Sequence, residues 1–155
     1  MKIWRYIILL ALCNCFVTAA FSSTESGPAP IYRSIAQIEL SMPLENYDGE
    51  RIKIAITDEI LRMVSSQYID MAWDSLKIEE EMIKSYVVAI DAKRIKDSSF
   101  VEIWVDSIDP LLATQLANAL AKTYISAKEY PDAIQPSIRQ TAKPPINPLN
   151  STWDK

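Results

Sequence analysis

The 155-residue sequence predicts an α+β fold, in which a small, mostly antiparallel sheet of three or four strands is covered by helices on one side. Two observations support this prediction. Apolar and polar residues alternate in segments that begin near residues 32, 85 and 99, which is typical of strands with one buried face. Between and after these segments, apolar residues recur at helical spacing. The chain length fits one domain.

The N-terminal segment, residues 1–22, predicts export. Lys2 and Arg5 precede an apolar run from Tyr6 to Phe16, and small residues suited to signal peptidase follow. The run is shorter than the ~20 residues that a membrane-spanning helix usually needs. A cleaved signal peptide and a retained membrane anchor both remain open. The two cysteines, at 13 and 15, fall inside this run, so the sequence predicts neither a disulfide framework nor a metal site.

A polar spacer, residues 23–30, leads into the first predicted strand at residues 32–42. Ala36, Ile38 and Leu40 share one face of this strand. The segment "RIKIAI" (51–56) alternates as well, after a turn signal at Asp48-Gly49. It is either a short strand paired with the first or the beginning of a helix.

From residue 57 the apolar period becomes helical. Thr57 is predicted to cap a helix that extends to about Met71, with acidic residues in its first turn, where the helix dipole favours negative charge. Ser75 is predicted to cap a shorter helix through "LKIEEEMIK". The acidic run 79–81 is interpreted as a solvated helix face rather than a cation site.

Two further strands, "SYVVAIDAKRI" and "SFVEIWVDS", are joined by the turn "KDSS". In the second of them, the buried face consists of Val101, Ile103 and Val105. The opposite face consists of Phe100, Glu102, Trp104 and Asp106.

The next helix begins with Asp109 as its cap and Pro110 as its first residue, where the missing N–H costs nothing. It is predicted to run to about Tyr130, where Pro131 ends it. Its core-facing stripe comprises Leu112, Ala113, Leu116, Ala117, Leu120, Ala121 and Tyr124. "SIRQTA" (137–142) is predicted as a last edge strand. The α+β domain thus covers residues 31–142, and a Pro-rich tail covers 143–155.

The composition argues against several function classes. Sixteen basic and 20 acidic residues give a net charge of −4, without the basic stripe that nucleic-acid binding requires. The sequence contains no histidine and only two isolated glycines, so the commonest general base and a phosphate-cradling loop are both absent. Asp106 and Asp109 are explained as a strand-end charge and a helix cap. We therefore predict a protein that is not an enzyme, with no catalytic, cofactor or metal residue.

Two features point to contacts with partners. Leu111, Asn118 and Ile125 lie seven residues apart on the helix side opposite the core stripe, where they meet either another part of the chain or a neighbouring subunit. Trp104 shares its strand face with charged residues, and it is either a core or interface residue or a platform for a sugar ring. Asn150 begins an "NST" sequence, which is a glycan acceptor only in a glycosylating secretory pathway.

The stretch "VEIWVDSIDPLLATQLANALAKTYI" (101–125) resembles the signature segment of the Wzz-type chain-length determinants, the polysaccharide co-polymerases of the bacterial inner membrane. In that family a strand leads into an Asp-Pro helix start and an Ala-Asn-Ala-Leu-Ala-x-x-Tyr helix. "YRSIAQIEL" and "ITDEILRMVSSQYIDMAWDSLKI" resemble the first periplasmic strand and the helical segment after it, and "TAKPPINP" is similar to an Ala-x-x-Pro-x-x-Pro return segment. The matching positions are Asp109, Pro110, Ala117, Asn118, Ala119, Tyr124, Pro145 and Pro148.

The resemblance covers about residues 32–148 in family order. The chain departs from the family in having only residues 128–137 where a long helical hairpin normally stands, and it lacks the second membrane helix and the kinase domain. It therefore resembles a minimal membrane-proximal domain.

The resemblance implies a ring-forming, non-enzymatic accessory of polysaccharide biosynthesis or export that sets chain length. Such a protein is periplasmic and is held to the inner membrane if its N-terminal segment is retained. Its expected partners are further copies of itself, full-length co-polymerases, the polymerase, export proteins and the polysaccharide. The expected interface residues are Leu111, Asn118 and Ile125, followed by Trp104. The alternative is an exported carbohydrate-binding or protein-interaction module that shares only the fold, with Trp104, Trp73 or Trp153 as stacking platforms.

Overall fold

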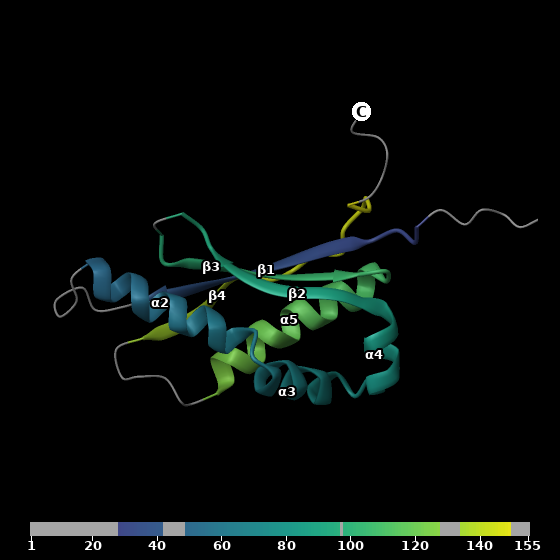
Figure 1. Cartoon of the computed structure of the whole chain (residues 1–155), viewed down its shortest axis with the longest axis horizontal. Coiled ribbons are helices and arrows are strands. Elements are labelled where there is room, and N and C mark those ends of the chain that lie inside the picture. The colour runs from purple at the N-terminus through teal and green to yellow at the C-terminus, as the bar shows by residue number, and fades with distance from the viewer. Residues whose placement is uncertain (1–27, 42–48, 97, 128–133, 150–155) are drawn as a thin grey trace, which may run out of the picture.

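The computed structural model describes residues 28–41, 49–96, 98–127 and 134–149. In this part of the chain, a four-stranded antiparallel sheet packs against four helices, which confirms the predicted α+β class (Figure 1). The predicted signal or anchor segment, Pro131, the "NST" sequence at Asn150, and Trp153 lie outside the described residues. The elements are β1 (Tyr32–Ser41), α2 (Gly49–Met63), α3 (Ser66–Leu76), α4 (Glu80–Tyr86), β2 (Val87–Arg94), β3 (Phe100–Ser107), α5 (Pro110–Ser126) and β4 (Gln135–Gln140).

The strands lie in the order β2-β3-β1-β4, and every neighbouring pair is antiparallel. β4 occupies one edge beside β1, as predicted for the last strand, but it begins and ends two residues before the predicted range 137–142. β1 and β2 therefore run parallel, with β3 between them, and α2, α3 and α4 connect them. In the same way β3 and β4 run parallel, with β1 between them and α5 in the connection, so the fold contains two split β-α-β units. Such crossovers are almost always right-handed, so the helices of both units cover the same face of the sheet.

The core lies between this face and α5, beneath the sheet in Figure 1. Ala36, Ile38 and Leu40 of β1 are buried, as are the three predicted core residues of β3. All seven residues of the predicted core stripe of α5 are buried as well. Alanines in this stripe allow the helix axis to lie close to the strands, where larger side chains would hold it away.

The start of α5 is as predicted, but its end is not. The Asp109 carboxylate accepts hydrogen bonds from the backbone N–H groups of Leu111 (2.8 Å) and Leu112 (3.2 Å), and Pro110 is the first helical residue. The helix ends at Ser126 rather than near Tyr130, because Ala127 already has an extended backbone. Pro131 therefore does not end the helix, which stops five residues before it.

Of the two alternatives for residues 51–56, the helical one is right. Ile52 and Ile56 are four positions apart in the sequence, a spacing that fits one face of a helix as well as one face of a strand. Thr57 is not a cap, since it lies inside α2 and its hydroxyl donates to the carbonyl of Lys53 at 2.8 Å. The predicted continuous helix is also interrupted at Ser65, which has an extended backbone and precedes α3. This break directs Tyr68 of α3 into the core against α5.

The predicted cap at Ser75 is also wrong. Ser75 lies within α3 and donates its hydroxyl to the carbonyl of Ala72 at 2.7 Å. Lys77, with a left-handed backbone (φ 54°), ends α3 instead, and α4 begins at Glu80. Among the described residues, no helix combines the length and the apolar character needed to cross a lipid bilayer.

Candidate functional site

The segment after β4, residues 141–149, is fixed to α5 by a side-chain amide, and because it contains the described part of the predicted Pro-rich tail it is called the tail from here on. Asn118 donates from Nδ2 to the carbonyl of Ala142 (3.1 Å), and its Oδ1 accepts from the N–H of Ala142 (2.7 Å). An asparagine amide presents a donor and an acceptor side by side, so it can satisfy both backbone groups of one residue, as a neighbouring strand would. Ala142 is buried at this contact. The two hydrogen bonds therefore fix the position at which the tail crosses α5.

Further contacts direct the tail along β1. The buried hydroxyl of Ser34 lies 2.9 Å from that of Thr114 on α5, and it donates to the carbonyl of Lys143 at 3.3 Å. Farther on, the N–H of Leu149 donates to the carbonyl of Ile31 at 2.6 Å. The last described residue thus lies beside the start of β1, and both ends of the described domain emerge at the same place (Figure 1).

Tyr124, the last residue of the family-like motif, holds the helical layer together. Its ring is fully buried, and its hydroxyl donates to Oε2 of Glu59 on α2 at 2.7 Å. Glu59 is only 2% exposed, and Nη1 of Arg62 lies 3.7 Å from its other carboxylate oxygen. The Tyr68 ring of α3 is 5.9 Å from the Tyr124 ring. Sequence reasoning placed Glu59 in a first helical turn and missed this buried role, because the distant tyrosine that it pairs with is not evident from local spacing.

The face of the sheet opposite the helices carries Trp104 within a polar network. Arg33 binds Asp106 through two hydrogen bonds, both 2.7 Å long, and its guanidinium lies 4.7 Å from the centre of the Trp104 ring. The hydrogen bond to Asp106 raises the pKa of Arg33 above its ordinary value. Trp104 Nε1 donates to Glu102 at 3.3 Å, and Gln37 donates to the same carboxylate at 3.1 Å. Arg33 therefore covers one face of the Trp104 ring, and a sugar could not stack on that face while Arg33 lies there.

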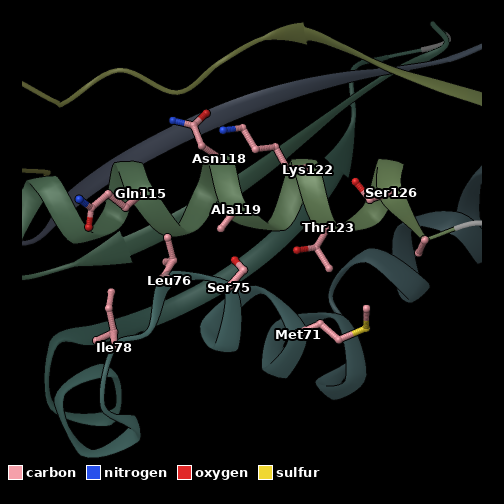
Figure 2. Close-up of a pocket in the computed structure, with 11 residues that line it drawn as sticks. Met71, Ser75, Leu76, Ile78, Gln115, Asn118, Ala119, Lys122, Thr123 and Ser126 are labelled. Carbon is pink, nitrogen blue, oxygen red and sulfur yellow. The ribbon is translucent and has the colours of Figure 1, made fainter.

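A groove of about 800 Å³ is lined by residues of α3 and α5, which pack against each other beside it (Figure 2). In Figure 2, Met71 and Ser75 of α3 lie across from Ala119 and Thr123 of α5, whereas Lys122 extends from α5 towards Asn118, on the side away from α3. The lining thus combines apolar side chains, hydroxyls, amides and one ammonium group. Within the described residues, no cluster of three or more His, Cys, Asp or Glu side chains could hold a metal ion. The chemistry of this groove suits recognition of an apolar segment that carries a negative charge.

The structure does not bring the three predicted interface residues into one exposed stripe. Leu111 is 55% exposed, whereas Ile125 packs partly against the core and the amide of Asn118 is occupied by Ala142. The tail accounts for this difference at Asn118, and packing against the core accounts for it at Ile125. Pro145 and Pro148 are half-buried in the tail, and Ala119 is a buried residue in the wall of the groove.

No protein-family model matches the chain, and no curated protein sequence matches it significantly.

Proposed function

We propose that the chain is a non-enzymatic assembly domain of bacterial polysaccharide biosynthesis or export, which acts by self-association or by joining co-polymerase partners to set polymer length. The observation that most supports this proposal is the contact between Asn118 and Ala142. Asn118 belongs to the Ala-Asn-Ala segment and Ala142 begins the Pro-rich return segment, and both segments carry the resemblance to the chain-length determinants. A purely accidental resemblance would not require the two segments to meet.

The arrangement of the chain ends is consistent with a membrane-proximal domain. The hydrogen bond between Leu149 and Ile31 holds the tail against the residues that follow the N-terminal spacer. In the chain-length determinants, a hydrophobic segment precedes the first strand and another follows the Pro-rich segment. If the apolar run at residues 6–16 is retained in the membrane, both ends of the described domain would face it.

Exposed apolar side chains support the assembly role. Leu111 and Met82 are each more than half exposed, and Met71 is 44% exposed at the groove. Side chains of this kind are usually covered by a partner when they gather on one side of a small domain. Glycan stacking on Trp104 is the second interpretation, and the guanidinium of Arg33 above the ring disfavours it.

The test is the length distribution of surface and secreted polysaccharide in cells from which the gene has been deleted and then restored. We expect deletion to shift the modal length or to stop export, and the wild-type gene to restore it. The oligomeric state of the purified full chain is measured in parallel by light scattering, where we expect a defined oligomer. An unchanged polysaccharide profile would refute the proposed function. Glycan binding that is lost on Trp104→Ala would favour the carbohydrate-binding alternative.

A further inference from the structure

The outward face of α2 carries an apolar stripe of two residues, neither of which belongs to the core formed by the described residues. Ile54 is 58% exposed and Leu61 is 64% exposed, although both are large apolar residues. They are seven residues apart, or about two helical turns, and therefore lie on the same side of the helix. Ile56 and Met63 on the opposite side are buried in the core. Asp58, which is exposed, lies on the outward side between the two apolar residues.

The groove between α3 and α5 is complementary to this stripe in length and charge. The α5 wall extends from Gln115 to Ala127, about 18 Å at the helical rise. The stripe from Ile54 to Leu61 needs about 10 Å, so both side chains fit along the groove. The groove supplies apolar surface from α3, and exposed Lys122 at its α5 rim is opposite in charge to Asp58.

We propose that α2 of one copy docks into the α3–α5 groove of a second copy, with Ile54 and Leu61 along its floor and Asp58 paired with Lys122. This inference rests on the proposed self-association and names the surfaces that carry it. Because the stripe points away from its own domain, it can fill a groove only on another molecule. The two surfaces differ, so the contact is head-to-tail, and its repetition produces a ring when the rotation between copies closes.

Association of the full-length protein is measured first, by sedimentation velocity over a range of concentrations. We expect Leu61→Glu to weaken association at least about tenfold, because it places a carboxylate in an apolar contact. The matched control is Ile146→Glu in the tail, which changes an apolar residue that is 92% exposed and should leave association unchanged. Asp58→Lys and Lys122→Glu should each weaken association about threefold to tenfold, and the chain that carries both changes should recover most of the loss.

Site-directed cross-linking then tests which surfaces meet. In a background in which Cys13 and Cys15 are replaced by alanine, one preparation carries Leu61→Cys and another carries Met71→Cys. We expect oxidation of the mixture to give a cross-linked dimer that neither preparation gives alone, and a ladder of larger products when one chain carries both changes. Such a ladder is specific to a head-to-tail contact.

The outcomes separate this inference from the proposed function. If the wild-type chain forms an oligomer that survives Leu61→Glu and gives no mixed cross-link, the α2–groove contact is refuted while self-association stands on other surfaces. If the wild-type chain is monomeric at every concentration, both self-association and the docking contact are refuted.

Discussion

The replacement Asn118→Ala distinguishes between two roles of the residue, as an anchor for the tail or as an interface residue. The change removes both hydrogen bonds to Ala142 and leaves the backbone groups of a buried residue without their partners. Each such bond contributes about 0.5–1.5 kcal/mol net, so the expected loss is about 1–3 kcal/mol in the free energy of unfolding. Release of the tail would limit the loss, because water can then reach Ala142.

Two measurements report the expected effect. Urea unfolding followed by tryptophan fluorescence should show a lower midpoint with an unchanged slope. Amide hydrogen exchange at Ala142 should be about fivefold to a hundredfold faster, since the anchor that protects this N–H is lost. The control is Gln115→Ala, an exposed position nearly one turn earlier on the same helix.

The opposite pattern would refute this reasoning. If Asn118→Ala weakened oligomer formation while the unfolding midpoint and the exchange of Ala142 matched those of Gln115→Ala, then Asn118 would act between subunits, as the seven-residue stripe predicts. Its contact with Ala142 would then contribute nothing measurable to stability.

Three further predictions follow from other contacts. Tyr124→Phe should lower the free energy of unfolding by about 1.5–3 kcal/mol, because the buried carboxylate of Glu59 loses a hydrogen bond. A variant as stable as the wild-type protein would contradict this role of the hydrogen bond. Asp109→Ala should lower the free energy of unfolding by about 0.5–2 kcal/mol, because it removes the cap of α5. Asp109→Asn should lower it less, since asparagine also caps helices, and equal losses for the two variants would argue against capping. The side-chain hydrogen bond and the charge of Lys84 lower the pKa of Glu80. The stabilisation of the folded state by this pair is therefore fully present above the usual glutamate pKa and is lost as the pH falls through the lowered pKa. Carbon NMR should show a Glu80 midpoint below that of ordinary glutamates, and Lys84→Ala should return it to the usual range.

The sequence alone determined the buried faces of the two central strands and the start of the principal helix. Alternation in β1 and β3 predicted their buried faces, because successive side chains of a strand point to opposite sides whatever lies beyond them. The start of α5 was equally predictable, because Asp109 bonds N–H groups only two and three residues away. Both features depend on neighbours in the chain, and local spacing is sufficient to predict them.

Only the tertiary structure decided the features that depend on distant partners. Local capping rules favoured Thr57 and Ser75 as helix starts, but both are interior residues whose hydroxyls donate to carbonyls within their own helices. Asn118 lies on a predicted interface stripe, yet Ala142, 24 residues away, occupies its amide. Helical periodicity shows which residues share a side of a helix. It cannot show whether that side meets solvent, another subunit or the chain's own tail, because the occupant is fixed by contacts between residues far apart in the sequence.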